Sequence, residues 1–243
     1  MKKALVILSG GQDSVTCLFW AIEKGYECSA ITFDYEQLHR IEIESAKKVC
    51  KIAGIENHEI LSMGPLFSGE SPLTNKKVSL DKYSSLDEVS PGIQRTFVPG
   101  RNLLFLTLAA NRAYSSNIDT MITGICEEDF GGYPDCRKDF IESLEETIFL
   151  GLERKITILT PLMNMKKSEI VLLAKKLPKN CWEALSFSHT SYDGKYPPTS
   201  NDHANLLRAK GFEEAGYPDP LVERAIRENL MERPKTKNYE NKD

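Results

Sequence analysis

The segment S-G-G-Q-D-S at residues 9–14 constrains the fold of this chain more than any other feature. It follows a short apolar run at residues 3–8 and precedes apolar residues at helical spacing, which predicts a strand, a glycine turn and a helix. Glycines in such a turn can adopt backbone angles closed to other residues and point successive N–H groups at one spot. The positive end of the following helix points at the same spot. The turn therefore predicts an anion site.

The side chains around these glycines suit the phosphates of a nucleotide. Asp13 offers a carboxylate to Mg²⁺ on the phosphates, and the hydroxyls of Ser9 and Ser14 are further donors. A simple tight turn would explain the glycines but not these neighbours. The predicted nucleotide-binding residues are Ser9, Gly10, Gly11, Gln12, Asp13 and Ser14, with Phe33 and Asp34 at the end of the second predicted strand. For the last two, an ordinary strand end remains an alternative. Nothing matches G-x-x-x-x-G-K-[ST], so Walker-type NTPases fit poorly.

Strand-like and helix-like segments alternate along the rest of the chain. We predict further strands at residues 27–33, 58–61, 119–125 and 156–162. We predict helices over residues 37–53, 101–114, 139–150 and 166–177. This alternation predicts an α/β fold with a doubly wound parallel sheet, in which ligands gather at the carboxyl ends of the strands.

The chain divides into three parts by pattern. We expect residues 1–180 to form the nucleotide-binding α/β domain and residues 181–231 a small C-terminal helical appendage. Residues 232–243 are charged and without an apolar anchor, which predicts a flexible tail. Residues 64–99 are rich in Gly, Pro, Ser and Thr, which indicates a partly ordered active-site loop.

The composition limits the partners. With 31 basic and 35 acidic residues among 243, the net charge of -4 gives no global attraction to nucleic acid or to an anionic membrane. No apolar stretch approaches the ~20 residues of a membrane span. The six cysteines are scattered and form no C-x-x-C pair, which indicates reduced thiols in a cytoplasmic protein. A small-molecule substrate fits these limits.

Two loops carry polar groups suited to such a substrate. Arg101 and Asn102 begin a predicted helix, where a cation opposes the helix dipole and so indicates an external anion; an exposed surface arginine is the alternative. The glycine-rich loop at residues 124–137 combines two acceptors, a flat ring and a cation, which suit a planar base and a carboxylate. These residues are Asp129, Asp135, Tyr133 and Arg137. Asp135 is also placed to cap the helix that follows.

The motifs resemble a superfamily and one family within it. S-G-G-x-D-S resembles the PP-loop of the adenine nucleotide alpha-hydrolase-like ATP pyrophosphatases, which cleave ATP between the α and β phosphates and transfer AMP to a substrate oxygen. Four further motifs resemble the 7-cyano-7-deazaguanine synthase family, along residues 3 to about 225. They are V-P-G-R-N at 98–102, D-x-x-G-Y-P-D-C-R at 129–137, T-P-L at 160–162 followed by Lys166 and Lys167, and L-R-A-K-G-F at 207–212.

This resemblance implies an ATP-dependent carbon–nitrogen ligase of queuosine biosynthesis. The family converts 7-carboxy-7-deazaguanine and ammonia to 7-cyano-7-deazaguanine through adenylated intermediates, with ATP and Mg²⁺, and is habitually a homodimer. Asp13, Arg101 and Lys166 are the expected catalytic residues, with Lys166 or its neighbour Lys167 neutralising the leaving pyrophosphate. For these lysines, a solvated helix start is an equal alternative. Cys136 has no sequence partner that would lower its pKa, which argues against a covalent role.

Two other functions stay open. One is a diverged PP-loop enzyme that adenylates a different carboxylate in nucleic-acid modification or defence. The other is a nucleotide-binding module without turnover, against which the intact Ser9, Asp13 and Ser14 argue.

The chain departs from the family at one place. The family holds a structural zinc on four cysteines spaced C-x7-C-x2-C-x2-C, and those positions fall here on Ser191, Thr199, Asp202 and Asn205. Hydroxyls and an amide are poor zinc ligands. We therefore predict no structural zinc, and hydrogen bonds of these four residues in its place.

Overall fold

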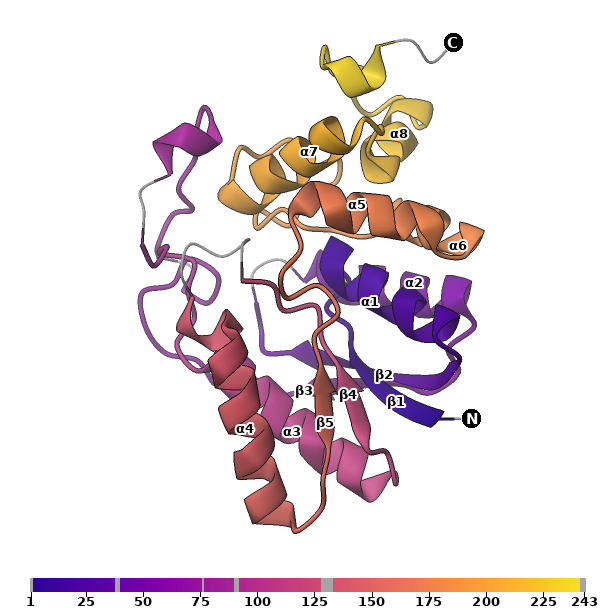
Figure 1. The fold of residues 1–243 in the computed structure, drawn as a ribbon. Helices are drawn as coiled ribbons and strands as arrows, with labels where there is room; N and C mark the ends of the chain where they lie inside the picture. Colours follow the sequence, from indigo (N-terminus) through magenta and orange to yellow (C-terminus); the bar gives the residue numbers. More distant parts are fainter. Residues whose placement is uncertain (1, 38–39, 76, 90–91, 128–132, 241–243) are drawn as a thin grey trace.

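The fold is a twisted parallel sheet between two helical layers (Figure 1). The computed structural model describes residues 2–37, 40–75, 77–89, 92–127 and 133–240. The five strands of its sheet lie in the order β3-β2-β1-β4-β5 and all pairs are parallel. Their bounds are β1 Lys2–Ile7, β2 Tyr26–Asp34, β3 His58–Ser62, β4 Thr120–Ile122 and β5 Thr157–Leu159. The predicted α/β class with a doubly wound parallel sheet is confirmed.

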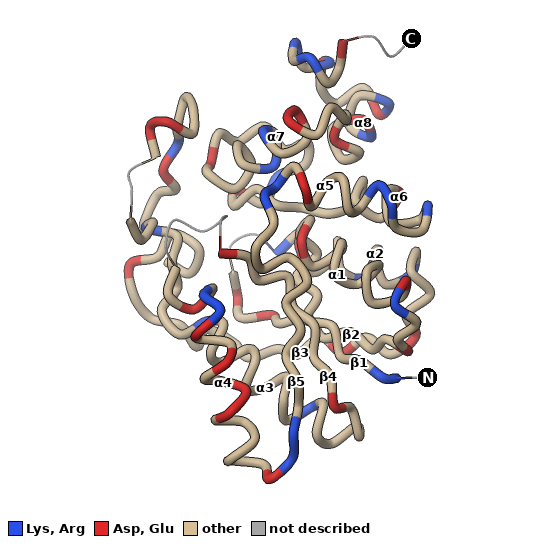
Figure 2. The backbone as a smooth tube through the Cα atoms, viewed as in Figure 1, with Lys and Arg blue, Asp and Glu red and all other residues tan. Residues whose placement is uncertain are grey.

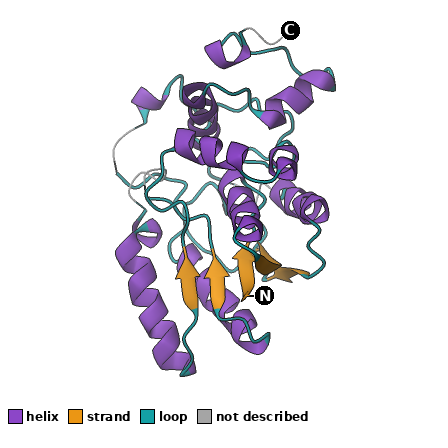
Figure 3. Cartoon of the chain, turned by 45° about the vertical axis from the view of Figure 1, so that its right-hand side comes forward, coloured by secondary structure: helices purple, strands orange, loops and turns teal. Residues whose placement is uncertain are grey.

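Helices cover both faces of the sheet, as parallel strands require. The helices of the first part are α1 Gln12–Glu23, α2 Ile41–Ala53, α3 Arg101–Ser115 and α4 Lys138–Leu152. Those of the second part are α5 Lys167–Lys176, α6 Lys179–Leu185, α7 His203–Ala215 and α8 Pro220–Arg227. Three short 3₁₀ turns are η1 Leu86–Glu88, η2 Pro134–Cys136 and η3 Lys237–Tyr239. The strand arrowheads point toward the side of the molecule where the C-terminal helices lie (Figure 3).

Two apolar cores lie on opposite faces of the sheet. One packs α1, α2, α5 and α6 on β1 and includes the fully buried Phe19, Leu18 and Ile170. The other packs α3 and α4 on the opposite face and includes Leu106 and Met121. Each large side chain removed from water in this way contributes about 1.5–3 kcal/mol. The sheet is therefore held as a rigid platform whose strand ends can carry a site.

The C-terminal helices continue the first of these cores. α6 spans the expected boundary between residues 180 and 181, and its Cys181, Ala184 and Leu185 belong to the core that α1 and α2 share. α7 packs on α5, and Gly211 allows the approach because a Cβ there would lie 2.6 Å from the Lys167 Cβ. The C-terminal helices thus pack directly on the helices that cover the sheet.

The final segment carries an anchor that the sequence analysis did not identify. Tyr239 is 7% exposed, and its hydroxyl oxygen accepts a hydrogen bond from the Asp219 backbone at 3.0 Å. Asn238 donates to the Tyr217 carbonyl at 3.0 Å. Residues 236–240 are therefore packed against α7 and α8, because an aromatic ring with a polar end can satisfy a buried backbone group.

The long connection before α3 is also partly packed. Leu73 and Val98 are buried, and the Tyr83 backbone donates to the Asn201 carbonyl at 3.0 Å.

Acidic and basic residues are interspersed along the elements rather than divided between two faces (Figure 2). Within the described residues, no helix has both the length and the apolar character to cross a bilayer.

Candidate functional site

A cavity of about 220 Å³ opens where β1, β2 and β4 end. Its walls include Ser9 after β1, Phe33 at the end of β2 and Thr123 after β4. Parallel strands present their carboxyl ends at one edge, so segments far apart in sequence converge there. This cavity therefore lies at the edge of the sheet where the sequence predicts that ligands gather.

The glycine turn forms the floor of this cavity. Ser14 Oγ accepts from the Gly10 backbone at 3.2 Å and donates to the Gly11 carbonyl at 3.0 Å, while Ser9 Oγ accepts from the Gly11 backbone at 3.2 Å. Gly10 has φ +91°, and a Cβ there would lie 2.3 Å from the Glu42 carbonyl oxygen of α2. The turn thus needs glycine for conformation and for space. It is fixed by its own serines before any ligand arrives.

Asp13 and Lys167 form an ion pair in the cavity wall. Lys167 Nζ lies 2.7 Å from Asp13 Oδ2, and the two side chains are only 10% and 17% exposed. The other carboxylate oxygen, Asp13 Oδ1, is buried without a hydrogen-bond partner in the described chain. A buried, unpartnered carboxylate oxygen at the start of a helix is a suitable ligand for a hard cation such as Mg²⁺. The donor set of the turn therefore fits a phosphate-bound metal ion.

The lysine in the cavity is the neighbour of the one that the sequence analysis assigned as catalytic. Lys166 is exposed and lies outside the cavity lining, where its backbone N–H donates to Glu169 at 2.8 Å as the cap of α5. Lys167 lies one position later on the helix and lines the cavity. Successive residues of a helix point in directions about 100° apart, so one of two neighbouring lysines can face solvent while the other faces the cavity.

Arg101 and Asn102, the first two residues of α3, also line the cavity. Burial opposes the charge of Arg101, but Tyr35, Tyr192 and Asp135 raise its pKa, so it is a permanent cation. Asp135 accepts from the Asn102 backbone at 3.2 Å, and the Asn102 side chain donates to the Asp135 carbonyl at 3.1 Å. Asp135 therefore caps α3 rather than the following helix, and it fixes the two residues that face the cavity.

Cys136 also lines the cavity but is poorly suited to a nucleophilic role. Burial raises its pKa to about 12, and the nearby Asp135 carboxylate adds to the shift. A thiol with such a pKa carries almost no thiolate at neutral pH.

Four other predicted residues that the structure describes, Asp34, Tyr133, Asp135 and Arg137, lie outside the cavity lining. Asp34 is paired with Arg40. Tyr133 is buried and shares a 2.6 Å hydrogen bond with Thr96. Arg137 is exposed at the start of α4, and Asp129 lies outside the described residues. The structure thus places the glycine turn, Phe33, Arg101 and Asn102 at the cavity, while Tyr133 and Asp135 lie behind the wall, close enough to interact with the charge of Arg101.

Several residues of the cavity wall carried no recognisable signal in the sequence. They are Glu42, Thr190, Tyr192 and His203, whereas Tyr35 belongs to the strand-end segment that the sequence indicates. The segments of these four residues open a helix or cross an irregular stretch, and only the tertiary fold places them together. Tyr35 and Tyr192 surround Arg101 and have raised pKa values because of burial, so both remain protonated at neutral pH.

Three of the four positions aligned with the family's zinc ligands are joined by hydrogen bonds. Asp202 is 1% exposed and accepts from Ser191 Oγ at 2.6 Å and from the Asn205 backbone at 3.0 Å. Thr199 is exposed and lies outside this network. No group of three or more His, Cys, Asp or Glu side chains suited to a metal ion occurs among the described residues.

Known proteins are similar to this chain along most of its length. The sequence profile described as "Queuosine biosynthesis protein QueC" matches residues 3–216. A relative from Gloeobacter violaceus, named 7-cyano-7-deazaguanine synthase, is 46% identical over 225 residues, which cover 91% of this chain and 96% of the relative. A relative of the same name from Chromobacterium violaceum is 43% identical over 226 residues, covering 92% and 94%.

A solved structure shares the fold. A Methanocaldococcus jannaschii protein, described as a predicted subunit of a tRNA methyltransferase, matches with a TM-score of 0.50 and 18% identity over 90% of this chain and 91% of its own. At that identity the match supports the architecture alone. The match along residues 3–216 and the two relatives above 40% identity go further. This chain belongs to the QueC family of queuosine biosynthesis proteins.

Proposed function

We propose that this chain is a 7-cyano-7-deazaguanine synthase, which uses ATP to convert 7-carboxy-7-deazaguanine and ammonia to the nitrile. The observation that carries the proposal is the composition of one cavity. Asp13 and Lys167 offer a metal ligand and a cation for phosphates, while Arg101 and Asn102 of the same cavity offer a cation and an amide for a carboxylate. Family membership supports the same activity.

The chemistry requires two activations because neither a carboxylate oxygen nor an amide oxygen is a good leaving group. The carboxylate attacks the α-phosphate of ATP, which gives an acyl adenylate and releases pyrophosphate. Ammonia attacks the acyl carbon, AMP leaves and an amide remains with loss of a proton. The amide oxygen then attacks the α-phosphate of a second ATP and pyrophosphate leaves, after which loss of AMP and of both protons of the amide nitrogen gives the nitrile.

The phosphate end of the site stabilises charge at the α-phosphate and on pyrophosphate. The Ser9 and Ser14 hydroxyls, and the Gly10 and Gly11 N–H groups that donate to them in this structure, would exchange these bonds for phosphate oxygens at the N-terminal end of the α1 dipole. Mg²⁺, when bound by Asp13, supplies charge neutralisation on the phosphates. Lys167 would then leave Asp13 for the phosphates and stabilise the leaving pyrophosphate.

The substrate end orients the carboxylate for attack. Arg101 is a planar donor whose fork matches a carboxylate with two parallel hydrogen bonds. Its position at the start of α3 is fixed by the contact of Asp135 with the next residue, so the substrate would meet a preorganised group. Cys136 lies nearby as a protonated wall residue rather than as a nucleophile.

We extend the proposal to the setting of the enzyme. A cytoplasmic homodimer whose partners are small molecules rather than nucleic acid follows from the family resemblance and the mildly acidic net charge of -4. We also keep the division into residues 1–180, 181–231 and 232–243 as a proposal. Sedimentation of the purified protein tests the dimer.

Incubation with 7-carboxy-7-deazaguanine, ammonium and Mg²⁺-ATP, followed by mass spectrometry of nitrile and AMP, tests the function. We expect both products in the native protein, and neither with Asp13→Ala. Lys167→Met should lower kcat about 10²-fold, the usual cost of removing a charge that stabilises a transition state. Lys166→Met is the matched control and should change kcat little. AMP without nitrile would refute the proposed acceptor, and absence of both products in the native protein would refute the proposed function.

A further inference from the structure

Residues 188–192, here called the strap, lie between the glycine turn and α7. The His189 backbone donates to the Gly10 carbonyl at 3.0 Å, and a Cβ added to Gly11 would lie 3.5 Å from the His189 carbonyl oxygen. Thr190 and Tyr192 of the strap line the cavity. The strap is therefore a wall of the site and a direct support of the phosphate-binding turn.

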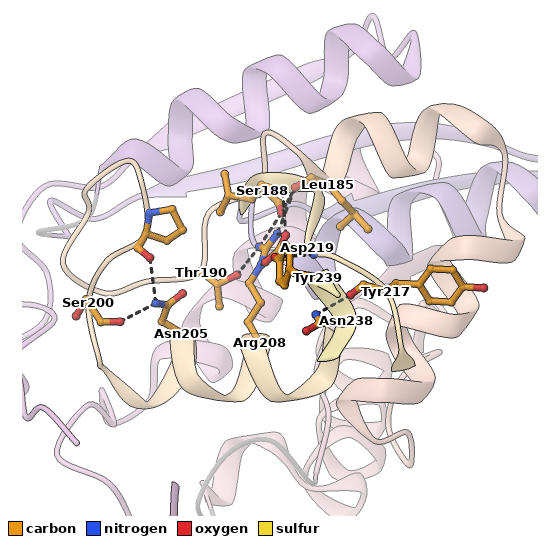
Figure 4. Close-up of polar contacts among 12 residues, drawn as sticks. Leu185, Ser188, Thr190, Ser200, Asn205, Arg208, Tyr217, Asp219, Asn238 and Tyr239 are labelled. Atoms are coloured by element: carbon orange, nitrogen blue, oxygen red, sulfur yellow. Dashed lines mark hydrogen bonds and ion pairs between the residues drawn. The ribbon is translucent and has the colours of Figure 1, made fainter. Parts of the chain in front are cut away.

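One end of the strap is held by Arg208 of α7, which is 1% exposed (Figure 4). Its Nη1 donates to Ser188 Oγ at 2.9 Å and to Thr190 Oγ1 at 3.0 Å. Its Nη2 donates to the Leu185 carbonyl at 3.3 Å, where α6 ends. Arginine is the side chain whose planar fork of donors can bind several acceptors in one fixed geometry. Arg208 thus joins the strap to α6 and α7 at once.

The guanidinium is itself fixed by a buried carboxylate. Arg208 Nε and Nη2 donate to the two oxygens of Asp219 at 2.6 and 2.8 Å. Asp219 is 4% exposed, caps α8 through the Leu221 backbone at 2.9 Å, and donates its own backbone N–H to Tyr239. A paired, fully hydrogen-bonded charge in such a place is costly to disturb. The Arg208 guanidinium is therefore held in one orientation, which in turn fixes the strap residues that it binds.

The other end of the strap is held by the first turn of α7. Asp202 accepts from Ser191 Oγ at 2.6 Å and from the Tyr192 backbone at 3.2 Å, while it caps α7 through Asn205. The same helix touches Lys167, because Gly211 leaves room for the Lys167 stem. α7 thus contacts both the strap and the helix that carries the phosphate-binding lysine.

We infer that Arg208 is a positioning residue for the nucleotide, acting through Thr190 and His189 on the glycine turn. It does not touch ATP; it sets the wall that ATP touches. The C-terminal helices are on this inference a part of the nucleotide site, and loss of the Arg208 contacts weakens ATP binding in protein that is still folded. The inference rests on the proposed function, because it takes ATP as the occupant of the turn.

Calorimetric titration of a non-hydrolysable ATP analogue with Mg²⁺ into Arg208→Lys tests the inference. This variant keeps the positive charge but loses the fork, and Arg227→Lys on the exposed face of α8 is the matched control. We expect the Kd for the analogue to rise about tenfold in Arg208→Lys, within the range of couplings carried through packed networks, and to stay unchanged in Arg227→Lys. Thr190→Val, which removes one acceptor of Arg208, should raise the Kd in the same direction.

Circular dichroism at the titration temperature separates positioning from folding. A role in stability alone would lower the Tm of Arg208→Lys and the fraction of competent protein, but it would leave the Kd of the folded fraction unchanged, and that result overturns the inference. If the native protein binds the analogue and only this comparison fails, the proposed function stands. If the native protein does not bind it, both are overturned.

Hydrogen exchange in the native protein decides the question should Arg208→Lys not fold. We expect the ATP analogue to slow exchange of the Ser188 amide and of the Asp219 and Leu221 amides, which lie around the Arg208–Asp219 pair and outside the cavity lining, with the amides of α4 as the unaffected reference. Protection confined to the glycine turn and α1 would overturn the inference.

Discussion

Replacement of Gly10 by alanine tests whether the glycine turn is held by its packing on α2. The added Cβ would lie 2.3 Å from the Glu42 carbonyl oxygen, 2.9 Å from the Ala46 nitrogen and 3.0 Å from the Ser45 Cβ. All three atoms belong to α2, and the two nearest are backbone atoms that a rotamer change cannot move. The helix or the turn must therefore shift.

Two costs add in this variant. The backbone angle of +91° costs an alanine about 1–2 kcal/mol. Forcing a methyl group into occupied space costs about 1–3 kcal/mol more. Gly25→Ala is the matched control, because Gly25 has φ +78° with no atom within 4 Å of an added Cβ. It has the first cost without the second, and the loss of chain entropy in the unfolded state is common to both.

Thermal unfolding of the two variants isolates the clash. The difference of about 1–3 kcal/mol corresponds to a Tm lower by about 2–12 °C for Gly10→Ala than for Gly25→Ala in a chain of this size. ATP binding should weaken in Gly10→Ala alone, since only this substitution displaces the turn. Equal Tm values for the two variants would show that α2 does not pack on the turn in solution, and the argument for a preorganised phosphate site would fail.

Four further predictions follow from the site. Burial raises the pKa of Cys136 from 9.0 to about 12, so its thiolate is about 10³-fold scarcer than that of an ordinary cysteine. Mass spectrometry should therefore find Cys136 among the last cysteines to react with iodoacetamide, and early alkylation of Cys136 would contradict this. Asp202→Ala should lower the free energy of unfolding in urea by about 2–4 kcal/mol, because it removes a helix cap and leaves buried donors unpaired. Dialysis of the native protein against a chelator should not change its Tm. Burial lowers the pKa of His203 below its ordinary 6.5, with Lys167 acting in the same direction and Asp202 against it, so the unfolded chain binds the proton more readily than the folded chain. Protonation of His203 therefore has no effect on stability above about pH 6.5 and destabilises the fold as the pH falls below that value. His203→Asn should reduce this loss of stability in urea titrations at stepped pH. In a double-mutant cycle, Asp13→Asn and Lys167→Met should each destabilise the protein, and the double variant should be more stable than the sum of the two losses predicts by about 1 kcal/mol or more. AMP formation should not return in the double variant. Additive losses of stability would argue against the ion pair.

Sequence patterns predict those parts of the site that depend on neighbours along the chain. The glycine turn is such a part, because strand, turn and helix are contiguous and the positive φ of Gly10 is a local demand. The alternation of strands and helices likewise fixes a parallel sheet, and with it the edge at which ligands gather. Both predictions use only short-range information, and the fold confirms the sheet.

Contacts between distant segments were beyond that information. Lys167 meets Asp13 across 154 positions, and nothing local distinguishes it from Lys166 beside it. Asp135 has the composition of a cap for the helix that follows, yet its carboxylate reaches α3, 33 positions earlier. In each case the residue type was recognised as polar and functional, while its partner was chosen by the packing of helices on the sheet.

The Asp13–Lys167 pair links the packing of this protein to its chemistry. Two opposite charges that are mostly withdrawn from water are stable only as partners, because either one alone would lack compensation. A Mg²⁺-nucleotide brings both signs together, a cation for the carboxylate and phosphates for the ammonium, so it can separate the pair without leaving either charge unpaired. A nucleotide without the metal offers phosphates to the Lys167 ammonium but no cation to the Asp13 carboxylate. On the proposed function, this ion pair would therefore favour the metal-bound form of ATP over the free form.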